Sequence, residues 1–116
     1  MNRRGFGAEG EQTARDWLTA KGIRVLEMNY RRPTGEIDII AMEGRTLLFI
    51  EVKRRTSLRY GRPAEAVTPA KRAHIQNTAA LYLQEHRLED VPMRFDIIEL
   101  LPGRVNHIEG AFMAGE

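Results

Sequence analysis

The sequence predicts an α/β fold in which helices flank a central β-sheet. Two segments carry apolar residues at helical spacing, and five shorter segments have the apolar character of strands. Glycine and proline residues separate most of these segments. In chain order the expected elements are a helix at 5–21, strands at 23–30, 36–42 and 46–53, a helix at 68–86, and strands at 93–101 and 105–108. This order, αβββαββ, is typical of a sheet covered by helices.

Both helices show start or stop signals as well as periodicity. In the first helix, Ala14, Trp17 and Leu18 fall at positions i, i+3 and i+4, and Gly22 stands where a helix ends. The second helix begins at Thr68–Pro69, because threonine is a good N-cap and proline suits the first turn. We therefore expect each helix to turn an apolar stripe towards the sheet.

The strands are bounded by turns. Proline and glycine mark a turn at 31–35, Glu43–Gly44 predicts a tight hairpin turn, and Pro102–Gly103 turns the chain into the last strand. The strand at 46–53 is nearly continuous in apolar residues, which favours a central position in the sheet. Residues 54–67 form a long connection, and connections of this length in a small domain are often functional.

Length and composition favour one globular domain at 1–116 with a loose tail at 110–116. The chain has 116 residues, of which 42% are hydrophobic and 29% are charged. The absence of cysteine excludes disulfides, thiolate zinc sites and a cysteine nucleophile. No apolar run approaches the length of a membrane span, and no apolar stretch follows the first basic residues. We expect a soluble cytoplasmic protein without a membrane partner.

The charge distribution indicates a polyanionic partner. The net charge is only +2, but residues 53–72 contain seven basic residues and one acidic residue. Most basic residues of the chain are arginine, which suits bidentate contacts with phosphate. A solvated basic loop is the alternative interpretation. The residues expected to contact nucleic acid are Arg54, Arg55, Arg59, Tyr60, Arg62, Lys71 and Arg72.

Acidic residues gather on one face of the predicted hairpin. With the turn at Glu43–Gly44, Glu36 faces Glu51, and Asp38 is a diagonal neighbour of Glu51. Since side chains alternate along a strand, Lys53 shares this face with the three carboxylates. Buried like charges are costly unless they are compensated. The pattern therefore predicts either a salt-bridged network around Lys53 or a site for a divalent cation with oxygen ligands.

A fourth acid can join this group. Glu11 lies seven residues before Leu18, so both point to the same side of the first helix, towards the core. Its alternative role is that of a first-turn acid favoured by the helix dipole. For a cation site we expect ligands from Asp38 and Glu51, with the Val52 carbonyl and Glu11 as further ligands.

The strand motifs resemble a known nuclease core. GEIDII at 35–40 followed by FIEVKRR at 49–55 resembles the PD-(D/E)XK motif, which has an acid on one strand and Glu-x-Lys on the next. Over nearly its whole length the chain resembles the bacterial YraN family. The further segments that carry this resemblance are GAEGE at 7–11, NYR at 29–31, YGRPAEAVTPAK at 60–71, RFDII at 94–98 and NHIEGAF at 106–112.

The resemblance implies a restriction-endonuclease-like, three-layer domain with a central mixed sheet, similar to archaeal Holliday-junction resolvases. It implies that Asp38 and Glu51 bind magnesium or manganese, that Lys53 is the catalytic lysine and that Glu11 is the helix-borne acid. The chain departs from the motif at Ile37, where the superfamily name has proline.

The expected function is hydrolysis of phosphodiester bonds in DNA by a metal-dependent endonuclease. Branched or damaged DNA in repair or recombination is the candidate substrate, and a homodimer is a candidate assembly. The alternative is a catalytically silent accessory factor that binds nucleic acid on a nuclease fold. A weaker third interpretation is an assembly factor that contacts proteins through the basic segment.

Overall fold

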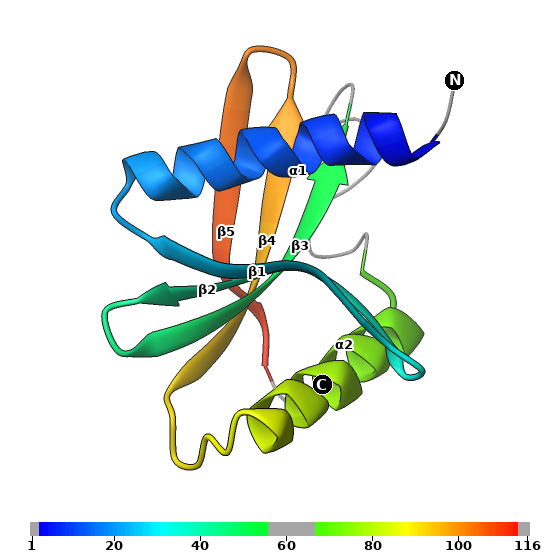
Figure 1. The fold of residues 1–116 in the computed structure, drawn as a ribbon. Coiled ribbons are helices and arrows are strands. Elements are labelled where there is room, and N and C mark those ends of the chain that lie inside the picture. The colour runs from blue at the N-terminus through cyan, green and yellow to red at the C-terminus, as the bar shows by residue number, and fades with distance from the viewer. Residues whose placement is uncertain (1–2, 56–66, 114–116) are drawn as a thin grey trace.

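The computed structural model describes residues 3–55 and 67–113, with side chains from Glu9 onward. Two helices lie on either side of a five-stranded sheet, and the order αβββαββ is confirmed (Figure 1). The elements are α1 (Arg3–Ala20), β1 (Arg24–Arg32), β2 (Gly35–Glu43), β3 (Thr46–Arg54), α2 (Pro69–Glu85), β4 (Met93–Leu101) and β5 (Arg104–Phe112).

The sheet is mixed and has the order β1-β2-β3-β4-β5. β3 and β4 are parallel, and the other three pairs are antiparallel. The predicted central place of β3 is confirmed. Parallel strands need a crossover connection, and α2 lies on this connection between β3 and β4.

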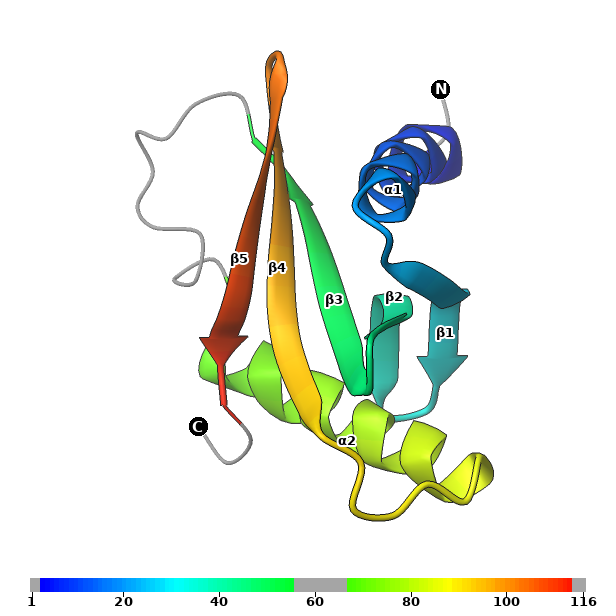
Figure 2. The same cartoon turned by 90° about the vertical axis from the view of Figure 1, so that its left-hand side faces the viewer.

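Each face of the sheet packs against one helix, as Figures 1 and 2 show. Alternation along β3 divides its side chains between two cores. Leu48 and Ile50 pack with α1, whereas Leu47 and Phe49 pack in the core that includes residues of α2. Glu51 continues the alternation of Leu47 and Phe49 along β3, and it therefore faces α2. The α1 core contains Ala14 and Leu18 of the helix, and the α2 core contains Ile75, Ala79 and Tyr82.

The register between β2 and β3 differs from the predicted one by two residues. We expected Glu36 to face Glu51, but Ile39 pairs with Ile50, and Asp38 is the acid of β2 that lies beside Glu51. An even shift by itself keeps side chains on their predicted faces. In β2, however, Ile37 packs in the α2 core and Ile39 in the α1 core, so the regular alternation is interrupted at Asp38. The shifted register moves Asp38 closer to the end of β3, where its carboxylate accepts a hydrogen bond from the Val52 amide.

The turn explains this shift. Glu43 pairs with Thr46, so the two turn residues are Gly44–Arg45 and not Glu43–Gly44. Gly44 has φ 61° and occupies the first turn position, where the mirror-image hairpin turns require a positive φ.

The C-terminal part is more ordered than we expected. The predicted last strand ended at residue 108 with a loose tail from residue 110, but β5 continues to Phe112. Phe112 is buried and its ring stacks on Phe95 at a centroid distance of 5.0 Å, which explains the extension. Residues 114–116 of the expected tail and residues 56–66 of the expected connection lie outside the described residues.

The β1–β2 hairpin is fastened to α2 by polar contacts. The Tyr30 hydroxyl donates to Glu85 at 2.6 Å, and the Arg32 guanidinium donates to both oxygens of Glu85 at 2.8 Å. At the hairpin turn, the hydroxyls of Thr34 and Thr78 lie 2.7 Å apart. These contacts fix the start of β2, which carries Asp38.

Gly35 marks a close approach between the backbone of this hairpin and α2. It has φ 147°, and a Cβ atom there would lie 3.1 Å from His74 Cβ and 3.2 Å from Thr78 Oγ1. Gly35→Ala should therefore lower the free energy of unfolding by about 3 kcal/mol, through backbone strain and overpacking. Urea denaturation followed by circular dichroism measures this loss.

Gly22→Ala is the matched control. Gly22 also has a positive φ, 84°, but a Cβ atom there would meet nothing within 4 Å. It should cost only the backbone strain, about 1 kcal/mol. Equal losses in the two variants would contradict the close approach of the hairpin to α2.

Candidate functional site

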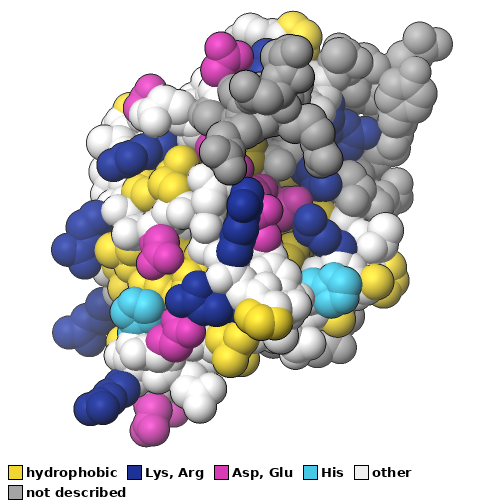
Figure 3. Space-filling view, turned by 45° about the vertical axis from the view of Figure 1, so that its right-hand side comes forward, with side chains coloured by type: hydrophobic (Ala, Val, Ile, Leu, Met, Phe, Trp, Pro, Cys, Tyr) yellow, Lys and Arg dark blue, Asp and Glu magenta, His cyan; other side chains and the backbone are white. Residues whose placement is uncertain are grey.

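The candidate site lies where β2 begins and β3 ends. Asp38 and Glu51 stand on adjacent strands, and the Asp38 Oδ2 atom accepts a hydrogen bond of 2.7 Å from the Val52 amide. In Figure 3 acidic side chains lie in the middle of this side of the molecule, between lysine and arginine side chains. The structure thus brings Asp38 and the Glu51–Lys53 pair together, as predicted, although the alternation of β2 is interrupted at Asp38.

Asp38 is the electrostatically most perturbed group of the site. Burial, first, and then the neighbouring Glu51 carboxylate raise the pKa of Asp38 to about 8, although the Val52 amide opposes this shift. Glu11 and Glu36 raise the same pKa further, so the three other acids of the group all act on Asp38. These effects favour the protonated form of Asp38 near neutral pH, where an aspartate is ordinarily ionised.

Two lysines hold Glu51. Its side chain is only 6% exposed, and its Oε2 atom lies 3.5 Å from Lys53 Nζ and 3.5 Å from Lys71 Nζ. Lys53 comes from the same strand, whereas Lys71 comes from the first turn of α2. The two ammonium groups compensate the buried carboxylate from two different layers of the fold.

Glu11 lies on α1 and approaches the acids of β2 and β3 from the helix. Burial raises its pKa, a hydrogen bond with the Asn29 side chain lowers it, and Glu36 and Glu51 raise it. Glu36 is more exposed and pairs with Arg31, whose Nε lies 2.6 Å from Glu36 Oε2. The predicted inward direction of Glu11 thus places it within electrostatic range of the strand acids.

The donor set fits a hard divalent cation with few protein ligands. Among residues 9–55 and 67–113, no group of three or more carboxylate or imidazole side chains is arranged to hold an ion. Asp38 and Glu51 supply two carboxylates, and Mg²⁺ is commonly held by one or two carboxylates with water and phosphate as its other ligands. The main-chain group of Val52 that contacts Asp38 is its amide, and ligation by its carbonyl stays a prediction.

The basic residues fall into three groups. Lys71 faces Glu51, and Arg54 is exposed at the end of β3. Arg55 and Arg72 contact the protein itself: Arg55 Nη1 lies 3.3 Å from the buried Glu99, and Arg72 Nε donates to the Val67 carbonyl at 3.0 Å. The predicted contacts Arg59, Tyr60 and Arg62 lie outside the described residues. The role of each of these residues in nucleic-acid binding stays a prediction.

Sequence reasoning missed two features of the site. It assigned Lys71 to nucleic acid and not to the acidic group, because the packing of α2 on β3 is a long-range contact. It also missed Asn29, which has φ 56° inside β1 and lies beside Glu11. The signal for Asn29 was available: asparagine is disfavoured in strands but tolerates a positive φ.

Comparison with known proteins identifies the family. The family model described as "Uncharacterised protein family UPF0102" matches residues 10–100, a range that includes Glu11, Asp38, Glu51, Lys53 and Lys71. The chain belongs to the UPF0102 family. A UPF0102 protein of Symbiobacterium thermophilum is 46% identical over 119 residues, which cover 98% of this chain and 100% of the relative.

Other UPF0102 proteins are similar over the same length. The protein of Clostridioides difficile is 44% identical over 114 residues, which cover 97% of this chain and 100% of the relative. The protein of Thermodesulfovibrio yellowstonii is 43% identical over 112 residues, which cover 97% and 99%. This confirms the family to which the resemblance pointed. Within the described part of this UPF0102 chain, no helix is long and apolar enough to cross a membrane.

The raised pKa of Asp38 predicts a pH-dependent stability. Its folded-state pKa of about 8 exceeds the ordinary value of 3.8, so the folded protein binds this proton more tightly than the unfolded chain. The stabilisation is therefore full below pH 4 and is lost as the pH rises through 8. Without divalent cations, the free energy of unfolding should fall by about 2 kcal/mol between pH 6 and pH 8.

Asp38→Asn should remove this part of the pH dependence, because the amide does not titrate and still offers an acceptor to the Val52 amide. Urea denaturation in EDTA at several pH values measures how the free energy of unfolding of each variant depends on pH. Asp90→Asn, an exposed position with φ 55° that asparagine tolerates, is the control and should keep the wild-type profile. Parallel profiles for wild type and Asp38→Asn would contradict the buried carboxylate pair.

Proposed function

We propose that this UPF0102 protein is a divalent-metal-dependent nuclease that hydrolyses phosphodiester bonds in DNA. The observation that carries the proposal is the convergence of Asp38, Glu51 and Lys53 on one partly buried spot, with Lys71 on the same carboxylate. Clustered carboxylates beside lysines suit the cleavage of a phosphodiester, which needs both a cation site and positive charge. A purely structural network would gain little from two adjacent buried acids.

In the proposed reaction, Asp38 and Glu51 hold Mg²⁺ or Mn²⁺, which supplies positive charge to polarise the phosphate. Asp38 must first give up the proton that burial and Glu51 favour, so cation binding should strengthen with rising pH. Lys53 lies 3.5 Å from Glu51 and is in position to orient the attacking water or to stabilise negative charge on the phosphate. Glu11 would hold a water molecule or a second ion.

Lys71 is proposed as a phosphate ligand of the same site. Its neighbour Arg72 is engaged by the Val67 carbonyl, whereas the Lys71 ammonium faces Glu51. When a cation neutralises Glu51, this lysine becomes available to a non-bridging oxygen of the phosphate. Its position in the first turn of α2, which carries no acidic residue, adds to the positive potential there.

The second candidate is a nucleic-acid-binding factor without hydrolytic activity. Two observations favour it: the lysines already compensate Glu51 without a cation, and no three-ligand group occurs among the described side chains. Such a protein would bind DNA with a steep dependence on salt. It would not depend on Asp38 for that binding.

Cleavage assays on single-stranded, duplex, branched and RNA substrates with Mg²⁺ or Mn²⁺ test the proposal. Asp38→Asn, Glu51→Gln and Lys53→Gln should each lower the cleavage rate by about 100-fold or more, since each removes a group that acts on the reacting phosphate. Lys71→Gln should instead raise KM by about tenfold, since it removes a charge-assisted contact with phosphate.

Arg45→Gln is the matched control. Arg45 lies in the β2–β3 turn, six residues before Glu51, or about 20 Å along an extended strand. This variant should cleave like the wild type. Cleavage that survives Asp38→Asn and Lys53→Gln would contradict the proposed site, and salt-sensitive DNA binding without any cleavage would favour the second candidate.

A further inference from the structure

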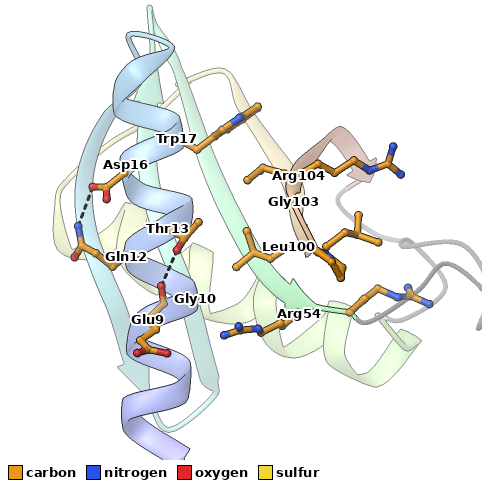
Figure 4. Close-up of a pocket in the computed structure, with 14 residues that line it drawn as sticks. Glu9, Gly10, Gln12, Thr13, Asp16, Trp17, Arg54, Leu100, Gly103 and Arg104 are labelled. Atoms are coloured by element: carbon orange, nitrogen blue, oxygen red, sulfur yellow. Dashed lines mark hydrogen bonds between the residues drawn. The ribbon is translucent and has the colours of Figure 1, made fainter.

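A groove that the candidate site does not use lies between α1 and the β4–β5 hairpin (Figure 4). Its volume is about 1250 Å³. One wall is the polar side of α1, with Glu9, Gln12 and Thr13, and the other wall is formed by the end of β3 and by the hairpin. This size exceeds that of most small-molecule pockets, so the groove suits part of a polymer.

The inner surface of the groove is apolar. Leu100 is 8% exposed, and it lies in the groove together with Trp17 and Val105. Gly10 allows α1 to lie close to this surface, because a Cβ atom at Gly10 would stand 3.3 Å from Leu100 Cδ1. A ligand that fills the groove must therefore present flat or apolar groups to these side chains.

The two walls differ in charge. The exposed Arg54 and Arg104 line the side formed by the sheet and the hairpin, where Arg55 is mostly buried against Glu99. The acids of the groove, Glu9 and Asp16, lie on α1. The Asp16 carboxylate already accepts a hydrogen bond of 2.9 Å from Gln12. The arginine wall can therefore face phosphates, while the carboxylate, amide and hydroxyl groups of α1 can face hydrogen-bonding edges of bases.

The groove begins where the candidate site ends. Lys53 belongs to the α2 side of β3 together with Glu51, and the next residue, Arg54, lines the groove on the α1 side. Consecutive residues of a strand point to opposite faces, so only the end of β3 lies between the candidate site and the groove. A nucleic-acid strand bound at the candidate site can pass over the end of β3 into the groove.

From these features we infer that the groove binds a single strand of nucleic acid that leads away from the candidate site. The inference rests on the proposed function for the chemical class of the polymer. Phosphates lie along the arginine wall and bases lie over Leu100 and Trp17. A duplex cannot use this surface, because its base faces are already stacked on one another. The substrates would therefore contain an unpaired segment, such as a flap, a fork or a free single strand.

Trp17 makes the groove directly observable, since it is the one tryptophan of the chain. A mixed-sequence single strand of roughly 15 nucleotides should quench its fluorescence saturably in EDTA, where no cleavage occurs. A self-complementary duplex hairpin should not do so at the same concentration, and a ribo-oligonucleotide shows whether RNA also binds. The affinity for the single strand should fall steeply with salt.

Arg104→Glu and Arg45→Glu form a matched pair of exposed charge reversals. Arg104→Glu should weaken single-strand binding by roughly tenfold and lower the salt dependence, whereas Arg45→Glu should not weaken it more than twofold. Equal weakening by both variants, equal quenching by the duplex, or no quenching at all would overturn the inference. Quenching without hydrolysis in Mg²⁺ or Mn²⁺ would leave the groove standing and remove the nuclease proposal.

Discussion

The arrangement of this protein depends on two carboxylates that stand side by side on adjacent strands. Asp38 and Glu51 meet because the β2–β3 hairpin turns at Gly44–Arg45 and because β3 is central. Burial and then repulsion from Glu51 raise the pKa of Asp38, and two lysines compensate Glu51. The surrounding fold holds this unfavourable pair in place. Lys71 of α2 compensates Glu51, and the hydrogen bonds from Tyr30 and Arg32 to Glu85 fix the β1–β2 hairpin on α2.

The same pair connects structure to the proposed chemistry. In the proposed function, a divalent cation at Asp38 would compete with the proton that burial and Glu51 favour there. Lys53 and Lys71 approach Glu51 from different layers, so a substrate phosphate would be met from the strand and from the helix. The groove on the α1 side extends this site across the end of β3, where alternation sends Lys53 and Arg54 to opposite faces.

Much of the fold follows from local signals. Thr68 caps α2 through its side chain, as the Thr68–Pro69 pair predicted. β4 begins and ends at the predicted residues, 93 and 101. The shared face of Glu51 and Lys53 was also predictable, because alternation along β3 survives a register error of two residues. The interruption of alternation at Asp38 in β2 was not predictable. The register itself was not, since it depends on which residue of the turn adopts a positive φ.

Contacts between layers could not be read from the sequence. The approach of Lys71 to Glu51 requires the position of α2 on the sheet, and the burial of Phe112 requires its stacking on Phe95. The groove forms because α1, which covers one face of the sheet, lies beside the end of the β4–β5 hairpin, a part of the sheet that is far from α1 in the chain. These features depend on packing between elements and not on the pattern within one element.

Direct titration of the Asp38 carboxyl carbon by NMR is the most direct test of the central claim. In metal-free protein the midpoint should lie near pH 8, and in Glu51→Gln it should fall, because the neighbouring negative charge is gone. Mg²⁺ should lower the titration midpoint of Asp38. Mn²⁺ is not used here, because it is paramagnetic and broadens the NMR signal. A midpoint near the ordinary aspartate value of 3.8 that does not respond to Glu51→Gln would contradict the account.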